Sequence, residues 1–372
     1  MFLLCSMMST KYWIFFFPFL LIEHKAISAQ EFGGVKTGSS PPSVSSILIF
    51  GDSTADPGNN NYIGTPFKSD FSPYGRDFFN HTPTGRFTNG LLANDFIAKY
   101  IGLKEIVPAY LDPSLTIDEL ISGVSFASAG SGFDPLTPSI SNVITLSDQM
   151  NHLKEYRRKV EAAAGEAKAK EVISNALFLV SAGTNDFVVN YFALPVRRRS
   201  YTIPSYIDFV SNGATQFLQE LLDEGARRIG VVGLPPMGCL PVVITLFTNH
   251  PILDRGCDDN FTSVARDYNQ ILQKELDALQ VRVRSSGARI AYLDAYTPLE
   301  EMTLGHKYGF DVVNSGCCGT GMVEASFMCN PKSPVCDDAS KYVFWDAIHP
   351  TQKSYDLIFQ SFRPALDYLV GN

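Results

Sequence analysis

Residues 46–53 have the sequence SILIFGDS, in which an apolar run stops abruptly at glycine, aspartate and serine. Short apolar runs bounded by turn residues are typical of buried strands, and Gly51 with Asp52 supplies the sharp exit. Ser53 would then lie at the carboxyl edge of a sheet, where open α/β folds place their chemistry. Taken alone, the stretch also fits a strand and turn in which Ser53 merely caps a helix.

Further apolar runs of the same kind follow along the chain, at 123–132 (a short strand entering a tight turn), 176–181, 228–233 and 289–294. Segments with helical spacing of apolar residues lie between them, at 91–100, 146–172 (interrupted by Gly165), 204–222 and 261–283. Strands that are apolar throughout and alternate with helices predict a parallel sheet covered by helices on both faces. We therefore predict a single α/β domain over residues 44–370, built as three layers (α/β/α) around a mostly parallel sheet.

Composition narrows the class of protein. The chain has 372 residues, with 45% hydrophobic and 18% charged residues, which fits a globular protein with a sizeable core. Its formal net charge of −8 argues against a nucleic-acid partner. The short basic runs at 157–159 and 197–199 are interpreted as solvated faces.

The N-terminus has the features of a targeting segment. An apolar run at 12–22 follows Lys11, and small residues then lead to a cleavage site after Ala29. The run is shorter than the ~20 residues that a membrane span needs. We predict a signal peptide over 1–29, a flexible leader over 30–43, no membrane span, and secretion to the extracellular space, which in a plant is the cell wall or apoplast.

Cysteine usage agrees with secretion. Six cysteines remain after removal of the signal peptide, and this even number predicts up to three disulfides. Cys239 and Cys257 bracket a proline-rich loop and are expected to pair, whereas the adjacent Cys317 and Cys318 are expected to pair elsewhere rather than with each other. A zinc site is the alternative, but the chain has no Cys-x-x-Cys knuckle, so no metal is predicted.

Two glycosylation sequons also agree with secretion. They begin at Asn80 and Asn260, and each places a threonine two residues later.

Several polar or small residues follow predicted strands. Ser53, the turn at Gly130 and Asn185 all lie just past a strand, and the carboxyl ends of parallel strands share one edge, so the three are expected to converge. The small residues around Gly130 leave backbone N–H groups available to an anion, although a purely structural turn fits them equally well.

A base for Ser53 is the remaining requirement for nucleophilic chemistry. His349 is preceded three positions earlier by Asp346, and this carboxylate can return to Nδ1 and stabilise the imidazolium. Nε2 would then face Ser53. A surface aspartate followed by a histidine that caps a turn is the alternative for this pair.

These motifs, in this order, resemble the plant-type GDSL esterase/lipase family of the SGNH hydrolase superfamily. The resemblance covers nearly all of the chain after the signal peptide and is carried by 51–53 (GDS), 59–62 (NNNY), 73–78 (PYGRDF), 84–90 (TGRFTNG), Gly130, 183–186 (GTND), 317–319 (CCG), Asp346 and His349. Two positions depart from the family pattern: Thr54 stands where the family name has leucine, and Ala129 where many members have glycine.

The resemblance implies a flavodoxin-like fold and hydrolysis of carboxylic esters without a cofactor. Ser53 matches the nucleophile, His349 the general base and Asp346 its orienting partner. The Ser53 and Gly130 amides and the Asn185 side chain match the oxyanion hole. The expected partner is a small-molecule or lipid ester, bound by a protein assumed to be monomeric.

Two other functions fit the same residues. An acyltransferase would use the same acyl-enzyme with an alcohol as acceptor, and a secreted binding protein would keep the scaffold without the reaction. The long loop from Asn59 to Gly90, rich in aromatic residues, is the predicted acyl or alcohol pocket, because ordering so long a loop costs entropy that ordinary connections avoid.

Overall fold

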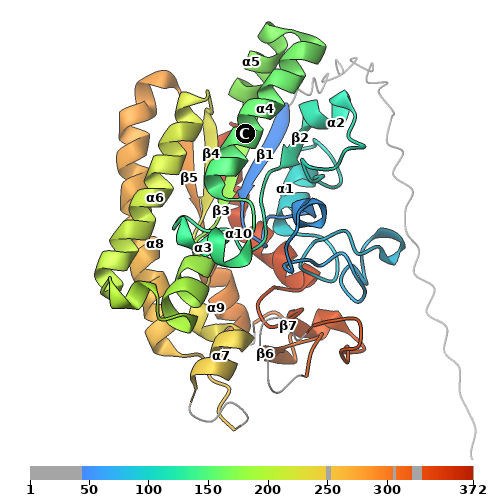
Figure 1. Ribbon diagram of the computed structural model, residues 1–372, viewed down its shortest axis with the longest axis vertical. Coiled ribbons are helices and arrows are strands. Elements are labelled where there is room, and N and C mark those ends of the chain that lie inside the picture. The colour runs from blue at the N-terminus through green and yellow to red at the C-terminus, as the bar shows by residue number, and fades with distance from the viewer. Residues whose placement is uncertain (1–43, 249–252, 305–306, 321–328, 372) are drawn as a thin grey trace, which may run out of the picture. The chain divides into compact units, whose positions relative to one another are not determined.

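A five-stranded parallel sheet forms the centre of the computed structural model (Figure 1). The strands are β1 (Ser46–Gly51), β2 (Gly123–Ser125), β3 (Ala176–Ser181), β4 (Arg228–Val232) and β5 (Arg289–Leu293), in the order β2-β1-β3-β4-β5. All neighbouring strands in this sheet are parallel, as predicted. The structure describes residues 44–248, 253–304, 307–320 and 329–371, so the expected signal peptide and leader lie outside the described residues.

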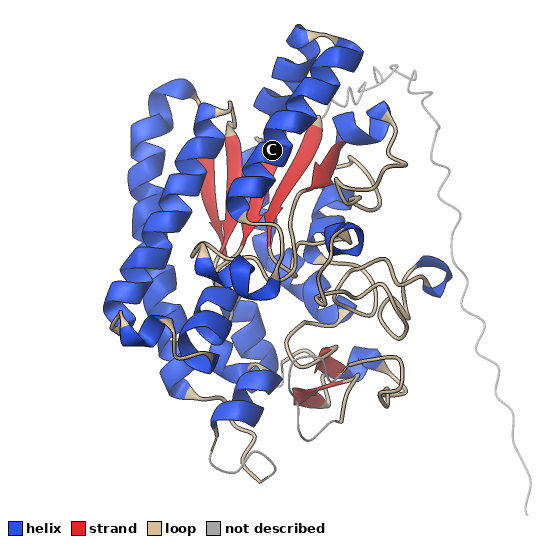
Figure 2. Ribbon diagram, viewed as in Figure 1, coloured by secondary structure: helices blue, strands red, loops and turns tan. Residues whose placement is uncertain are grey.

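Helices cover both faces of the sheet, which gives the predicted three layers (Figure 2). The α-helices are α1 (Ala93–Tyr100), α2 (Ile117–Ser122), α3 (Leu136–Ser141), α4 (Leu146–Ala164), α5 (Glu166–Asn175), α6 (Ile203–Asp223), α7 (Pro241–Phe247), α8 (Asp259–Val283), α9 (Tyr296–Leu304) and α10 (Gln352–Val370). Helices α1 and α10 pack together on one face, whereas α4, α6 and α8 lie on the other. Gly165, with φ +88°, separates α4 from α5 where the sequence predicted an interruption.

The exits of β1 and β3 lie side by side. The chain leaves β1 toward α1 on one face and leaves β3 toward α6 on the other, and such a switch point is where parallel α/β sheets bind ligands. Gly51 and Ser181 are paired at the carboxyl ends of the two strands. A Cβ on Gly51 would lie 1.9 Å from the Ser181 carbonyl oxygen, so the exit of β1 requires glycine.

A second, two-stranded sheet was not predicted from the sequence. Its strands, β6 (Val312–Gly316) and β7 (Tyr342–Phe344), are parallel, and β7 leads directly to Asp346. Most residues of β6 are only half-buried and its sequence is VVNSG, so it lacks the continuous apolar run that identifies the central strands.

Three disulfides stabilise the described chain. Cys239 pairs with Cys257, as predicted, and the adjacent cysteines pair with separate partners, Cys317 with Cys336 and Cys318 with Cys329. Both adjacent cysteines contact the strand before Asp346, because the Cys317 N–H donates to the Phe344 carbonyl and the Cys318 N–H to the Trp345 carbonyl (3.0 and 2.7 Å).

The long loop from Asn59 to Gly90 is held to the sheet by buried polar contacts. Asn59 donates from Nδ2 to the carbonyls of Ser125 and Ala127 (both 2.8 Å). Arg86 makes a two-pronged ion pair with Asp95 on α1, with N–O distances of 2.9 and 2.8 Å, and both side chains are buried. These bonds offset the entropy cost of ordering the loop.

Candidate active site

Ser53, His349 and Asp346 form a continuous hydrogen-bonded array at the carboxyl edge of the sheet. His349 Nε2 lies 2.8 Å from Ser53 Oγ, and His349 Nδ1 lies 2.8 Å from Asp346 Oδ2. If Nδ1–H donates to the carboxylate, Nε2 is left to accept the hydroxyl proton of Ser53. All three residues are buried. The arrangement therefore has the geometry needed to activate a serine hydroxyl.

The chain around Asp346 folds into a turn that holds the histidine in place. Asp346 Oδ1 accepts the backbone N–H groups of Ile348 (2.8 Å) and His349 (2.7 Å). Burial alone would raise the pKa of Asp346, but the charge of His349 and these hydrogen bonds outweigh it and keep that pKa below its ordinary value. Thr351 then caps α10 by accepting the Ser354 N–H, so the turn sits between β7 and a long helix.

Residues from the long loop contact this pair and lie outside the cavity beside Ser53. Tyr74 donates from its hydroxyl to Asp346 Oδ2 over 2.7 Å, and the ring of Phe87 lies 4.9 Å from that of His349. No residue from 59 to 90 lines the cavity beside Ser53 within the described chain. The loop therefore does not form this cavity, as an acyl pocket would require, and Tyr74 and Phe87 instead contact the Asp346–His349 turn. A role of the loop in binding the alcohol stays a prediction.

The structure places Asn185 beside Ser53 but leaves Gly130 in the neighbouring turn. Ser53 and Asn185 both line the same cavity, which Gly130 does not. Asn185 donates from Nδ2 to the Ser131 carbonyl over 2.9 Å, which ties the end of β3 to the turn that contains Gly130. Gly130 has φ +93°, a backbone conformation that favours glycine.

The next residue, Asp186, also holds the chain that follows this turn in place. Its buried carboxylate accepts the N–H groups of Phe133 (2.9 Å) and Asp134 (3.1 Å). Burial raises the pKa of Asp186 to about 7, although hydrogen bonds from Thr137 and these amides oppose the rise. No role was predicted for this aspartate from the sequence, and its place directly after Asn185 was the available signal.

Thr54, which departs from the family pattern, joins the two strand exits. It donates from Oγ1 to Asp52 Oδ1 (2.8 Å), and the same hydroxyl lies 2.8 Å from Ser181 Oγ. Since the Thr54 proton goes to Asp52, Ser181 donates to Thr54. Burial raises the pKa of Asp52 to about 6, against the hydrogen bonds from Thr54.

An apolar cavity of about 80 Å³ opens beside Ser53. Apolar side chains from β4, α9 and α10 and from the loops after the strands form most of its wall; they include Val232, Leu234, Leu240, Leu299, Ile358 and Phe362. Such a cavity suits an apolar group attached to a carbonyl that Ser53 attacks.

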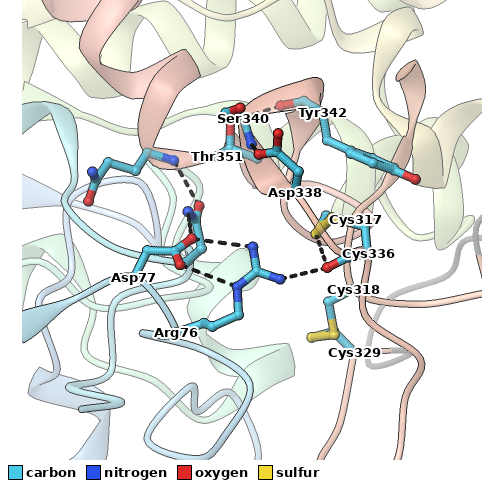
Figure 3. The surroundings of a disulfide bond; sticks show 12 residues. Arg76, Asp77, Cys317, Cys318, Cys329, Cys336, Asp338, Ser340, Tyr342 and Thr351 are labelled. Carbon is cyan, nitrogen blue, oxygen red and sulfur yellow. Dashed lines mark hydrogen bonds and ion pairs between the residues drawn. A yellow bond between two sulfur atoms is a disulfide. The ribbon is translucent and has the colours of Figure 1, made fainter. Parts of the chain in front are cut away.

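The disulfide region lies next to the long loop. Figure 3 shows Arg76 between Asp77 and Cys336, and its Nη1 donates to the Cys336 carbonyl over 2.7 Å. The guanidinium also lies 5.2 Å from the centre of the Trp345 ring, next to Asp346 in the chain. Arg76 thereby links the long loop to the cystine-bearing segment.

The described residues contain neither a metal-binding cluster nor a membrane-spanning helix. No cluster of three or more histidine, cysteine, aspartate or glutamate side chains there is arranged to hold a metal ion. Within the same residues, no helix combines the length and apolar character that a membrane crossing requires. The sequons at Asn80 and Asn260 both begin at exposed residues.

A parallel α/β/α fold with a serine–histidine–aspartate array at its carboxyl edge is the type of architecture that serine hydrolases use. Residues 47–362 match the sequence model of the GDSL-like Lipase/Acylhydrolase family. The chain belongs to this family, and it is a carboxylic ester hydrolase.

The chain is similar to curated plant relatives in sequence and, more distantly, to solved bacterial and metagenomic structures. A GDSL esterase/lipase of Arabidopsis thaliana is 57% identical over 331 residues, covering 89% of this chain and 88% of the relative. A second from the same plant is 45% identical over 322 residues, covering 85% and 88%. Among solved structures, a mutant of an acetylxylan esterase from Geobacillus stearothermophilus is 14% identical with a TM-score of 0.39, covering 87% of this chain and 94% of that one. An alpha/beta hydrolase from a Lake Arreo metagenome is 13% identical with a TM-score of 0.41, covering 87% and 96%.

Proposed function

We propose that this chain is a secreted serine esterase that hydrolyses acyl esters through an acyl-enzyme on Ser53. The observation that carries the proposal is the unbroken array from Ser53 Oγ through His349 to Asp346, with both hydrogen bonds at 2.8 Å. The apolar cavity beside Ser53 supports an acyl group as the part of the substrate that enters.

In the first half-reaction, Ser53 Oγ attacks the ester carbonyl carbon while His349 Nε2 takes the hydroxyl proton. The negative charge that develops on the carbonyl oxygen is stabilised by the Ser53 and Gly130 amides and by Asn185 Nδ2. Asp346 stabilises the imidazolium without taking its proton. When the tetrahedral intermediate collapses, the ester C–O bond breaks and His349 gives the proton to the departing alcohol.

In the second half-reaction, His349 takes a proton from water as the water oxygen attacks the acyl carbon. Collapse of this intermediate breaks the bond to Ser53 Oγ, returns the proton to Ser53 and releases the carboxylic acid. Transfer to an alcohol would follow the same path with another acceptor. Hydrolysis is proposed because the relatives are esterases and lipases, and no feature of the described residues favours an alcohol acceptor.

The proposal includes the division of the chain and its export. Residues 1–29 are removed as a signal peptide, 30–43 form a leader, and 44–370 form the hydrolase domain. The three disulfides support passage through an oxidising compartment, and the exposed Asn80 and Asn260 are available for glycosylation there. A mature N-terminus at Gln30 on the secreted protein is the expected result, and an uncleaved chain retained in the cell would contradict export.

The test of the mechanism compares the wild-type protein with Ser53→Ala in hydrolysis of a short-chain acyl ester. The substitution removes one hydroxyl, so the variant is expected to fold and to lose at least about 10³-fold in kcat. Ser139→Ala, which alters an exposed serine, is the matched control. A fluorophosphonate should add its mass to the peptide that contains Ser53 in the wild-type and control proteins. Hydrolysis undiminished in Ser53→Ala would overturn the assignment.

A further inference from the structure

The end of β1 is held by a buried side chain from outside the active site. Gln149 lies on α4 and has none of its surface exposed. Its Oε1 accepts the Gly51 N–H and its Nε2 donates to the Gly51 carbonyl, both over 2.9 Å. Gly51 ends β1 and is two residues before Ser53. One amide side chain therefore pairs with both backbone groups of the residue at which the chain turns toward Ser53.

Gln149 takes the place that a longer neighbouring strand would occupy. Strand β2 pairs with β1 as far as Ile49 and ends at Ser125. Beyond that point the Gly51 carbonyl also accepts the Ser128 N–H over 3.0 Å, whereas the Gly51 N–H donates to Gln149. Buried backbone groups need such partners, and an amide side chain carries the same donor and acceptor as a peptide group. Gln149 thus extends the hydrogen bonding of β1 to its last residue.

The same amide also reaches the turn to which Asn185 is bonded. Gln149 Nε2 donates to Ser131 Oγ over 3.3 Å, and the Ser131 hydroxyl proton goes to the Ile144 carbonyl. The Ser131 carbonyl in turn accepts from Asn185 Nδ2 over 2.9 Å. An amide nitrogen carries two protons, so one is used on Gly51 and the other on Ser131. The side chain thereby joins two segments of the chain with its full hydrogen-bonding capacity.

This link connects the two parts of the proposed reaction centre. The path from Ser53 runs through Gly51, Gln149 and Ser131 to Asn185. Because the amide is fully buried, little water is available to replace its hydrogen bonds. Donors to a developing oxyanion act only at the correct distance from it, and a displacement of about 1 Å in a reaction centre can cost about 10²-fold in rate.

We propose that Gln149 is a positioning residue for ester hydrolysis, which fixes the Ser131 turn, and through it Asn185, at the distance from Ser53 that the transition state requires. Gln149 is not among the described residues that line the cavity beside Ser53, so it acts through these neighbours and not on the substrate. The inference rests on the proposed function, since the role of Asn185 as an oxyanion donor is part of that proposal.

The first experiment measures kcat and KM for p-nitrophenyl butyrate with the wild-type protein and Gln149→Met. Methionine is also long and unbranched, but it removes all three hydrogen bonds. We expect kcat to fall by about 10²-fold and KM to stay within about twofold, because both half-reactions pass through an oxyanion. An unchanged kcat, or a change confined to KM, would overturn the inference.

Gln280→Met is the matched control. Gln280 on α8 also pairs its amide with the backbone of a strand: Nε2 donates to the Ala288 carbonyl over 3.0 Å and Oε1 accepts the Ile290 N–H over 2.6 Å. This contact lies at the amino end of β5, on the edge of the sheet opposite Ser53. The control should lose stability and keep its kcat. Equal losses of kcat in both variants would show that Gln149 supports only the fold, and would overturn the inference.

A double-mutant cycle with Asn185→Ala separates positioning from a general loss of structure. If Gln149 acts through Asn185, the loss of kcat in the variant with both substitutions should be at least about tenfold smaller than the product of the two single losses. A defect of the fold alone would multiply with Asn185→Ala. Losses that simply multiply would therefore overturn the inference.

Gln149→Glu is a second variant, which keeps the shape of glutamine. Protonated glutamate accepts at one oxygen and donates from the other, so it can restore both hydrogen bonds to Gly51, whereas the ionised form has no donor. Burial favours the protonated form at low pH, so kcat should lie within about fivefold of the wild-type value at about pH 6 and fall toward that of Gln149→Met at about pH 9. A kcat as low as that of Gln149→Met at both pH values would overturn the inference.

Failure of the inference and failure of the proposed function give different results. Hydrolysis that is lost in Ser53→Ala and undiminished in Gln149→Met would leave the serine esterase intact and remove the positioning role. A wild-type protein without Ser53-dependent hydrolysis of p-nitrophenyl butyrate would overturn the proposed function and the inference together.

Discussion

The hydroxyl of Tyr74 donates to Oδ2 of Asp346 over 2.7 Å, although the two residues are 272 positions apart in the chain. Oδ2 is also the atom 2.8 Å from His349 Nδ1. The phenol therefore shares the carboxylate oxygen on which the orientation of the histidine depends. Because Tyr74 and Asp346 are both buried, little water is available to replace this hydrogen bond.

Tyr74→Phe is expected to lower kcat/KM by about tenfold, the effect of losing one hydrogen bond to a buried charge. Without the phenol donor, Asp346 Oδ2 keeps more of its negative charge for His349 Nδ1–H and favours the protonated, inactive imidazolium. The acid limb of the pH–rate profile should then move to higher pH, a change that a loss of packing alone would not produce. A pH profile of kcat/KM for the variant measures the shift.

Tyr100→Phe is the control for this substitution. Tyr100 donates to Asp367 over the same distance, 2.7 Å, but the pair joins α1 to α10 away from the reacting groups. It should leave the pH profile unaltered. An acid limb that moves equally in both variants would contradict a specific role for Tyr74.

The Tyr74 contact shows what the sequence could not predict. The apolar runs identified the five central strands because a strand buried on both faces needs apolar residues throughout. The cavity and the role of Tyr74 depend instead on contacts between distant segments, for which no local period exists. A pattern of aromatic residues over 59–90 indicates burial but not the partner, so the loop was assigned to a pocket, whereas other elements form the cavity beside Ser53.

The sequence predicted that Ser53, Asp346 and His349 come together, whereas it did not predict the wall of the cavity. Ser53 and Asn185 follow neighbouring parallel strands, and Asp346 is three residues before His349, so the topology and a local turn bring them together. Gly130 lies in the turn to which Asn185 is bonded, but the rule that strand ends converge fixes only the edge of the sheet and not which amide faces the cavity, so its place in the oxyanion hole stays a prediction.

Asn185→Ala is expected to lower kcat by about 10²–10³-fold with a small change in KM, because its proposed role is to donate to charge that develops only in the transition state. Steady-state kinetics on a short acyl ester measure the split between kcat and KM. Asn142→Ala, which removes an exposed amide that donates to the Gly64 carbonyl, should change neither constant. An effect of Asn185→Ala on KM alone would assign the side chain to ground-state binding instead.

Arg86→Met is expected to lower the free energy of unfolding by about 3–5 kcal/mol, because it leaves the buried Asp95 carboxylate without its cation. The side chains of this pair are 4% and 1% exposed. The comparison is Lys99→Met, which breaks a pair with Glu105 whose side chains are 60% and 66% exposed and should cost at most about 1 kcal/mol. Denaturant unfolding of both variants measures the difference, and equal losses would show that burial does not set the value of the Arg86 pair.

Two buried carboxyls with raised pKa values should make the folded protein more stable in mild acid than at neutral pH. Burial raises the pKa of Asp186 to about 7 and that of Asp56 to about 6, whereas an aspartate in the unfolded chain titrates near about 4. Between these values the folded protein binds protons that the unfolded chain does not. The contribution of these groups to the free energy of unfolding is therefore present at low pH and is lost as the pH rises through about 6–7.

Asp186→Asn isolates this contribution from those of other titrating groups. The stability of the variant relative to wild type should be about 2 kcal/mol lower at pH 5 than at pH 8, because the wild type loses this much stability over that interval and the variant does not. Asp277→Asn, at an exposed position on α8, should show a difference that changes far less with pH. Urea unfolding at the two pH values gives both quantities. A constant difference for Asp186→Asn would mean that its carboxylate stays charged in the fold, held by the amides of Phe133 and Asp134 despite its burial.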